Sequence, residues 1–231
     1  MAVKGGSGRN MAVRLKRASK LSHSSQQWLT RQLNDPFVAR ARAEGYRSRA
    51  AFKFLEIDDR YKLLKPGMRI ADLGCAPGGW AQIAARRVKS AEGQGRVAGI
   101  DLLPVEPIPG VIFEQLDFND NNAPERLKVM LGGPADGVLS DMAANTTGHK
   151  KTDHLRIIGL TELAVDFAAE VLVQGGFFLT KLFQGGESAD LVARLKREYS
   201  SVRHIKPEAS RKDSSELYVL AAGFRGGKSS A

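Results

Sequence analysis

The sequence predicts a doubly wound α/β fold, in which helices cover both faces of a mostly parallel sheet. From residue 69 onward, short apolar runs alternate with segments of helix length. This alternation is typical of parallel strands joined by crossover helices. The 231 residues are enough for one such domain with a sizeable core. The expected strands are 69–73, 96–100, 111–115, 135–140 and 176–183, and the expected helices lie near 79–90, 122–131 and 152–173.

The C-terminal part of the chain breaks this alternation. A helix expected near 187–199 is followed by two apolar runs at 202–205 and 216–222, and the polar stretch 206–215 between them contains no helical pattern. A connection without a crossover helix suits an antiparallel pair of strands. The sheet is therefore expected to end in an antiparallel hairpin.

The folded domain is expected to begin at Asp35. This residue and Pro36 have the pattern of a helix N-cap followed by proline at the first helical position. The helical stretch that follows is interrupted near Gly45 and resumes at Ser48 through about Tyr61. The predicted domain therefore spans 35–225, with a flexible tail at 226–231.

Positive charge is concentrated before this domain. The net charge is +10, and residues 1–34 supply +7 of it because they contain no Asp or Glu. The segment is rich in Gly and Ser, so a disordered basic arm is expected, which would gain affinity for polyphosphate by releasing counterions. A solubilising tail and a mitochondrial transit peptide are the alternatives. The cations of the arm are Lys4, Arg9, Arg14, Lys16, Arg17, Lys20 and Arg31.

Composition excludes several classes of protein. Hydrophobic residues make up 42% and charged residues 26% of the chain, as in an ordinary globular domain. No stretch reaches the roughly 18 uncharged apolar residues of a membrane span, and no apolar signal core opens the chain. Cys75 is the only cysteine, so it cannot form an internal disulfide. A monomeric cytoplasmic protein without membrane association is expected.

A glycine-rich turn directly follows the first expected strand. It reads Asp72-Leu-Gly-Cys-Ala-Pro-Gly-Gly-Trp80, and such glycines let the backbone turn tightly and approach a ligand at a helix N-terminus. A nicotinamide enzyme usually has G-x-G-x-x-G here to hold a pyrophosphate. The spacing in this chain differs, and Pro77 lacks an N–H donor. The turn therefore does not match the dinucleotide-binding fingerprint.

Acidic residues after the next two strands favour S-adenosylmethionine as the cofactor. This molecule has no phosphate, and it offers a carboxylate, a ribose diol and an adenine. Asp101 ends the second strand, where a carboxylate can accept hydrogen bonds from both ribose hydroxyls, and Asp117-Phe118 follows the third strand, where it could contact the adenine. Cys75 in the turn is interpreted as a packing residue rather than a nucleophile. A doubly wound sheet ending in an antiparallel hairpin is also the architecture of class I methyltransferases.

The residues after the fourth strand constrain the methyl acceptor. In such folds the chemistry takes place at the carboxyl ends of the strands, and the segment here reads Ser140-Asp-Met-Ala-Ala-Asn145. Methylases of the adenine amino group have Asp/Asn-Pro-Pro-aromatic at this point, and cytosine C5 methylases have Pro-Cys. Neither pattern is present, so neither base atom is the expected acceptor.

Six motifs occur in order along the chain. They are Tyr46-Arg-Ser-Arg-Ala-Ala-Phe-Lys53, Asp72–Trp80, Asp101-Leu-Leu-Pro104, Ser140-Asp-Met-Ala143, Lys181-Leu-Phe-Gln-Gly185 and Ser210-Arg-x-x-Ser-x-Glu-x-Tyr218. Together they resemble the FtsJ/RrmJ family of 23S ribosomal RNA (uridine-2′-O)-methyltransferases. The resemblance covers about residues 36–224 and leaves the basic arm outside. Ala144 is a departure, because this family often has proline there.

The resemblance implies a site and a substrate. It implies ribose 2′-O-methylation of large-subunit ribosomal RNA, within the assembled subunit. No metal site is expected, because His149 and His154 lack further ligand-type neighbours. Our hypothesis is that Lys181 acts as a general base or orients the acceptor oxygen, that Lys53 and Glu216 fix the ribose, and that Asp141 links Lys181 to the methyl site. The implied catalytic residues are Lys53, Asp141, Lys181 and Glu216, and the implied cofactor contacts are Gly78, Trp80, Asp101, Asp117 and Asp141.

Three alternatives remain open at this point. The chain could methylate another RNA, such as transfer RNA or a messenger cap, or a hydroxyl of a small molecule or protein. It could also be a non-catalytic RNA-binding factor in ribosome assembly. Basic residues near the expected site favour an RNA partner if they converge on one surface. These residues are Arg40, Arg42, Arg47, Arg49, His149, Lys150, Lys151, Arg211 and Lys212.

Overall fold

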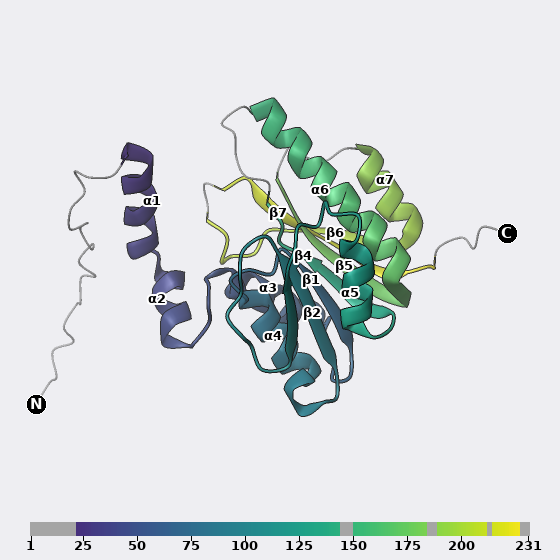
Figure 1. Cartoon of the computed structure of the whole chain (residues 1–231). Coiled ribbons are helices and arrows are strands. Elements are labelled where there is room, and N and C mark those ends of the chain that lie inside the picture. The colour runs from purple at the N-terminus through teal and green to yellow at the C-terminus, as the bar shows by residue number, and fades with distance from the viewer. Residues whose placement is uncertain (1–21, 144–149, 184–188, 212–213, 227–231) are drawn as a thin grey trace, which may run out of the picture.

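The computed structural model describes residues 22–143, 150–183, 189–211 and 214–226. Its centre is a sheet with the strand order β3-β2-β1-β4-β5-β7-β6, in which β7 runs antiparallel to both of its neighbours and the other pairs are parallel (Figure 1). The predicted doubly wound sheet with a C-terminal antiparallel hairpin is confirmed. The strands are β1 (Arg69–Leu73), β2 (Arg96–Asp101), β3 (Val111–Gln115), β4 (Ala135–Ser140), β5 (Leu172–Phe183), β6 (Tyr199–Ile205) and β7 (Glu216–Phe224).

Helices cover both faces of this sheet, as predicted (Figure 1). Phe54 of α3 and Trp80 of α4 pack with strand residues in one buried cluster. Leu127 of α5, Phe167 of α6 and Leu195 of α7 belong to a second cluster on the opposite face. Two apolar layers therefore bury the central strands, which accounts for their continuous hydrophobic runs. The helices are α3 (Ala50–Tyr61), α4 (Gly79–Val88), the short η2 (Ser90–Glu92), α5 (Ala123–Leu131), α6 (Lys150–Val171) and α7 (Ala189–Glu198).

The segment before α3 departs in part from the expected disordered arm. The structure has a helix α1 (His23–Leu33) inside the range 1–34, so the prediction of disorder is wrong for these residues. They contain neither Gly nor Pro and include several good helix formers, whereas the glycines of the segment lie at its start. Residues 1–21 and 227–231 lie outside the described part of the chain.

The helix N-cap predicted at Asp35 is confirmed at α2 (Pro36–Ala43). Asp35 is its N-cap, the Asp35 side chain accepts a hydrogen bond from the Phe37 N–H, and Pro36 occupies the first turn. Phe37 and Phe52 pack with ring centroids 5.7 Å apart, which joins α2 to α3. Figure 1 shows α1 and α2 to one side of the sheet.

Two strands begin earlier than the sequence pattern predicted. The helix expected to end near residue 173 ends at Val171, and β5 starts at Leu172, which pairs with Ala135 across a register irregularity. β6 starts at Tyr199 because this residue pairs with Phe224 and its ring packs on that of Phe224 at 5.2 Å. In both places sheet pairing overrides the local helical pattern.

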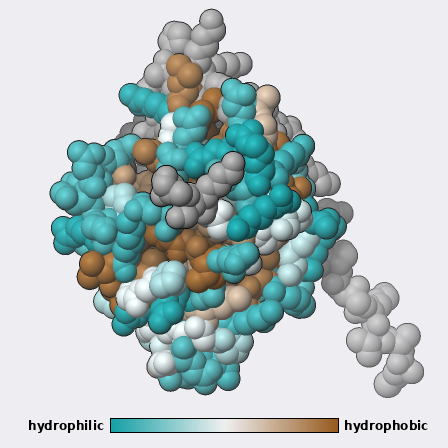
Figure 2. All heavy atoms as spheres, turned by 90° about the vertical axis from the view of Figure 1, so that its right-hand side faces the viewer, coloured by the Kyte–Doolittle hydropathy of each residue, from teal (hydrophilic) through white to brown (hydrophobic). Residues whose placement is uncertain are grey.

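The helices described in the structure include none that is long and apolar enough to span a bilayer. Figure 2 shows the face on the right-hand side of Figure 1, where hydrophobic residues lie among hydrophilic ones. Exposed apolar side chains include Val129 of α5 and Leu155 of α6.

Candidate functional site

The turn between β1 and α4 requires glycine at two positions. Gly74 and Gly78 have φ angles of 74° and 107°, a backbone region that side chains disfavour. A Cβ atom at Gly74 would lie 2.8 Å from the Met142 side chain, and one at Gly78 would lie 2.5 Å from Ile108 Cδ1. The first N–H groups of α4 have no carbonyl acceptor within the helix, so they point toward the space beyond this turn.

Asp101 ties this turn to the end of β2. Its Oδ2 accepts a hydrogen bond from the Ala76 N–H at 2.8 Å, and its Oδ1 accepts one from the Leu103 N–H at 2.8 Å. Asp117 follows β3 and is exposed, and its Oδ1 accepts hydrogen bonds from the backbone and side-chain amides of Asn119. Both carboxylates therefore lie at the same edge of the sheet, as the sequence predicted.

Two aromatic residues expected at the cofactor lie mainly in the core. The Trp80 side chain is 3% exposed, and its indole N–H donates to the Ala50 carbonyl at 2.9 Å. Trp80 can therefore reach a ligand only through its backbone. Phe118 is 8% exposed and packs edge-to-face on Phe167, and its contact with an adenine stays a prediction. Local spacing placed these residues near the turn, but their apolar rings are buried in the core.

Asp72 is a buried acid beneath the turn. It is fully buried, and neither carboxylate oxygen has a hydrogen-bond partner among the described residues. Burial, reinforced by the negative charges of Asp141 and Asp101, raises the pKa of Asp72 to about 8. The sequence analysis quoted Asp72 as part of the glycine-rich motif and assigned it no role. Only its burial shows that this carboxyl differs from the acids around it.

The lone thiol of the turn is a packing group. Cys75 is buried, and a Cβ atom at Gly99 of β2 would lie 2.8 Å from its Sγ. Burial, followed by the charges of Asp72 and Asp101, raises the pKa of the Cys75 thiol far above its usual value. A thiol that keeps its proton is a poor nucleophile, which agrees with the interpretation from the sequence.

Lys181 and Asp141 form the first half of a polar group at the carboxyl ends of β4 and β5. The Lys181 ammonium lies 2.9 Å from Asp141 Oδ1 and donates to the Asp141 carbonyl at 2.6 Å. The Asp141 N–H donates to the Leu73 carbonyl at 3.1 Å, which fixes this segment beside the end of β1 and the glycine-rich turn. Lys181 is 9% exposed, so its ammonium is held at an otherwise apolar strand.

Lys53 and Glu216 form the second half. Lys53 lies on α3, Glu216 opens β7, and the Lys53 ammonium donates to Glu216 Oε1. Burial alone would raise the pKa of Glu216, but the charge of Lys53 and hydrogen bonds from Lys53 and Tyr218 outweigh it and lower that pKa. Glu216 is therefore ionised near neutral pH and holds the lysine in place.

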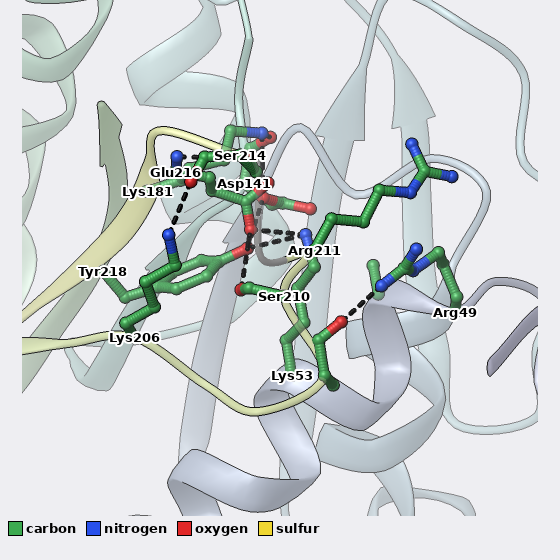
Figure 3. Close-up of polar contacts among 12 residues, drawn as sticks. Arg49, Lys53, Asp141, Lys181, Lys206, Ser210, Arg211, Ser214, Glu216 and Tyr218 are labelled. Atoms are coloured by element: carbon green, nitrogen blue, oxygen red, sulfur yellow. Dashed lines mark hydrogen bonds and ion pairs between the residues drawn. The ribbon is translucent and has the colours of Figure 1, made fainter. Parts of the chain in front are cut away.

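Tyr218 lies between the two halves (Figure 3). Its hydroxyl lies 2.9 Å from Glu216 Oε1 and 3.3 Å from Asp141 Oδ1, and it accepts a hydrogen bond from the Lys53 ammonium at 3.5 Å. Burial, followed by the charges of Asp141 and Glu216, raises the pKa of Tyr218 well above its usual value. The phenol therefore keeps its proton. It can donate that proton in a hydrogen bond to either Glu216 or Asp141, but not to both at once.

The structure thus brings all four predicted catalytic residues together and adds Tyr218 at their centre. The sequence analysis included this tyrosine in a motif without assigning it a role. Its position two residues after Glu216 was the available signal, because residues i and i+2 of a strand point to the same face.

The predicted arginines do not form one free basic surface. Arg47 donates to the carbonyls of Glu106 and Pro107, and Arg49 pairs with Asp35. Arg40 pairs with Glu44 within α2, and Arg42 is exposed. Three of these four guanidinium groups therefore have partners within the protein. His149 and Lys212 lie outside the described residues, and no side-chain position is described for Lys150 and Lys151.

Comparison with known proteins decides the family. The model of the family described as FtsJ-like methyltransferase matches residues 46–224, which is most of the chain. The chain belongs to the FtsJ-like methyltransferase family. The match runs from the residues before Lys53 through β7, so it includes both halves of the polar group and the glycine-rich turn.

The FtsJ-like assignment agrees with individual relatives. A protein of Xanthobacter autotrophicus named ribosomal RNA large subunit methyltransferase E is 63% identical over 223 residues, covering 96% of this chain and 88% of the relative. A Bradyrhizobium protein of the same name is 63% identical over 218 residues, covering 94% of each chain. A solved ribosomal RNA methyltransferase of Plasmodium falciparum is 31% identical with a TM-score of 0.69, covering 79% of this chain and 100% of that chain.

This FtsJ-like protein is a methyltransferase that uses S-adenosylmethionine as methyl donor. Its cofactor site fits that molecule on structural grounds. The two glycines let the turn pack against Met142 and Ile108 where a side chain would clash, and the acids Asp72, Asp101 and Asp141 suit a cationic ligand rather than a pyrophosphate. The cofactor predicted from the sequence is therefore confirmed.

Tyr218→Phe tests the hydroxyl at the centre of the FtsJ-like site. Removing it leaves Glu216 without one of its buried donors, so we expect the free energy of unfolding to fall by about 1 to 3 kcal/mol. The matched control is Tyr199→Phe, because the Tyr199 hydroxyl is buried with no hydrogen-bond partner among the described residues. Urea unfolding should show the control unchanged or more stable. Equal losses in both variants would contradict the prediction.

Proposed function

We propose that this protein transfers the methyl group of S-adenosylmethionine to the 2′-hydroxyl of a uridine ribose in large-subunit (23S) ribosomal RNA. The observation that carries the proposal is the group Lys53, Asp141, Lys181 and Glu216, gathered around Tyr218 beside the glycine-rich turn. The names of the bacterial relatives support the same class of substrate. The site contains none of the base-stacking or thiol motifs that base methylation uses.

The proposed cofactor contacts follow from the geometry of the turn. The backbone of Gly78 and Trp80 at the start of α4 would hold the carboxylate of the cofactor, because helix N-termini favour anions. Asp101 would accept from the ribose hydroxyls and Asp117 would contact the adenine. Asp141 would face the methyl end, because it joins the turn to Lys181.

A bound S-adenosylmethionine supplies an electrophilic methyl group. The residues of this chain must then place a ribose oxygen in line with that methyl group, so that the oxygen attacks as its hydroxyl proton leaves. Ordering the two reactants supplies a large part of the rate acceleration. Lys181 is placed to contact such an oxygen, because its ammonium lies 2.9 Å from Asp141, which is hydrogen-bonded to the end of β1 beside the turn.

Lys181 has two possible ways to act in this proposal. Two acceptor atoms of Asp141 contact its nitrogen, an arrangement that suits an ammonium which orients the oxygen and stabilises its developing charge. In that case the hydroxyl proton passes to solvent water. To act as general base, it must first lose a proton. In both cases the side chain contacts the acceptor oxygen, and its removal should slow the reaction strongly.

Lys53 and Glu216 would position the ribose. Lys53 is 9% exposed and is held by Glu216 and Tyr218, so its ammonium has little freedom to swing into solvent. A fixed donor beside the acceptor sugar reduces the entropy that the reaction must otherwise lose. Outside this pocket, exposed Arg42 and the basic residues of the segment 1–34 would contact phosphates without reading sequence.

The finer parts of the proposal concern context. We propose that the substrate is the assembled large subunit, that the protein acts as a monomer in the bacterial cytoplasm, and that the catalytic domain spans 35–225. Agreement between the match to residues 46–224 and the N-cap at Asp35 supports these bounds.

The deciding experiment supplies radiolabelled S-adenosylmethionine to RNA from cells that lack this protein. Assembled large subunits, naked 23S RNA and total transfer RNA are compared as acceptors, and the modified ribose is mapped. We expect label in one uridine of the large subunit. Label in transfer RNA alone would replace the proposed substrate, and no label in any RNA would refute the proposed function.

A further inference from the structure

Asp35 does more than cap α2. Its carboxylate is 8% exposed and lies between two guanidinium groups from distant parts of the chain. Oδ2 pairs with Arg49 at the start of α3 and lies 3.2 Å from Arg211 Nη2 and 3.4 Å from Arg211 Nε. Oδ1 remains with the N–H of Phe37. One buried carboxylate thus joins α2, α3 and the connection between β6 and β7.

That connection leads directly to the catalytic group. Arg49 also donates to the Ala209 carbonyl, and the next residue, Ser210, donates its hydroxyl to Glu216 Oε1 at 3.4 Å. The same oxygen atom, Glu216 Oε1, also accepts the hydrogen bonds from Lys53 and Tyr218. Figure 3 shows Arg49, Arg211 and Ser210 beside Lys53.

Further contacts keep this connection against α3. The Glu56 carboxylate accepts hydrogen bonds from the Glu208 and Ala209 N–H groups at 3.0 and 3.3 Å. Ala209 is buried with Ala41 of α2 and Phe52 of α3 in a small apolar cluster. Contacts from α2 and α3 therefore hold the connection in place. The negative charge of Asp35 keeps Arg49 of α3 beside Arg211 of the connection.

We propose that Asp35 is a positioning residue for methyl transfer, which holds the 206–211 connection so that Ser210 and Glu216 keep Lys53 in its reactive place. The inference rests on the proposed function. Asp35 touches neither the acceptor nor the cofactor in this account, and it acts through Arg49, Arg211 and the connection. Because a displacement of about 1 Å at a reacting group can cost about 10²-fold in rate, small shifts of the connection suffice.

The test compares two variants that differ in helix capping. Asp35→Asn keeps the size and the capping oxygen but removes the charge that pairs the arginines, whereas Asp35→Ala also removes the cap. Methyl transfer to large subunits is measured with enough RNA to separate kcat from KM. Cofactor affinity and stoichiometry are measured by calorimetry to count folded sites. Asp166→Asn is the control, because it breaks the exposed pair with Arg194 on α6 and α7.

We expect both Asp35 variants to lose about tenfold in kcat, with KM for RNA and cofactor binding within about twofold of the unmodified protein. Asp35→Ala should also unfold at a lower temperature than Asp35→Asn, while Asp166→Asn keeps the original kcat. Loss of bound cofactor in proportion to kcat would show only partial unfolding and would overturn the proposal. A rise in KM alone would assign these charges to RNA affinity and would overturn it as well.

A double-mutant cycle tests the route from Asp35 to Glu216. Ser210→Ala removes only one hydroxyl, so it should fold even if the Asp35 variants do not. We expect it to lower kcat, and we expect Asp35→Asn to add little in its presence, because residues on one path are non-additive. The proposal would be contradicted if the fold-losses in kcat of the two single variants multiplied in the double variant. An unchanged kcat in Ser210→Ala would contradict it as well. If the unmodified protein methylates no RNA, the proposed function fails first and the inference falls with it.

Discussion

Replacing Lys181 with alanine should lower the rate constant of methyl transfer by about 10²- to 10⁴-fold, while the protein still binds S-adenosylmethionine. Lys181 lies near the end of β5, and Asp141 holds its ammonium through one carboxylate oxygen and the backbone carbonyl. Whether it removes the proton or stabilises the developing charge, its loss takes away an interaction that exists mainly in the transition state. Its effect should therefore appear in kcat rather than in cofactor affinity.

The measurement is single-turnover transfer of labelled methyl groups to large subunits, with cofactor binding measured separately. Lys128→Ala is the matched control, because this lysine lies on α5 and pairs with Glu125 and Glu170 away from the polar group. It should transfer methyl groups at the original rate. Near-original activity of Lys181→Ala with normal cofactor binding would remove Lys181 from the mechanism.

The protein without cofactor should become less stable as the pH rises, and Asp72 should be the main cause. The pKa of Asp72 is 3.8 in the reference state and about 8 in the folded protein, so the folded state binds this proton more tightly. The stability that its protonation contributes is complete below about pH 4 and is lost as the pH rises through about 8. Between these limits the loss is about 1.4 kcal/mol for each pH unit, which is several kcal/mol in all.

Asp72→Asn should remove this dependence, because asparagine carries no charge at any pH. Urea unfolding of the cofactor-free protein should show the variant gaining stability over the original chain between about pH 5 and about pH 8, and no further above that range. The control for the substitution itself is Glu92→Gln, which neutralises an exposed acid away from the site. A constant difference between Asp72→Asn and the original protein across this range would show that the buried carboxyl does not titrate as proposed.

The contacts of Asp35 illustrate what local sequence can and cannot reveal. The Asp35-Pro36 pair was enough to predict the start of α2, because capping depends on a hydrogen bond to a residue two positions away. The pairing of the same carboxylate with Arg211 joins residues 176 positions apart. No spacing rule connects such residues, so this role became visible only in the folded chain.

Tyr218 and Trp80 show the same difference between what the sequence reveals and what the folded chain reveals, now inside the site. Each lies in a motif that the sequence marked as functional, but the motif did not distinguish a side chain that faces the ligand from one that faces the core. The Trp80 ring packs on Phe54 at 4.9 Å and on Tyr218 at 5.5 Å. The Tyr218 hydroxyl extends from this aromatic cluster to Glu216 and Asp141.

By itself, the sequence determined the alternation of strands and helices, the glycine-rich turn and the types of residue needed for the chemistry. Periodicity, capping and turn formation depend on neighbours within a few positions, so they can be read along the chain. Only the tertiary structure decided that Lys53 and Glu216, 163 positions apart, form a pair and that Asp72 is buried without a hydrogen-bond partner among the described residues. The strand order β1-β4-β5-β7 and the packing of α3 against the sheet bring Lys53 to Glu216 and bury Asp72.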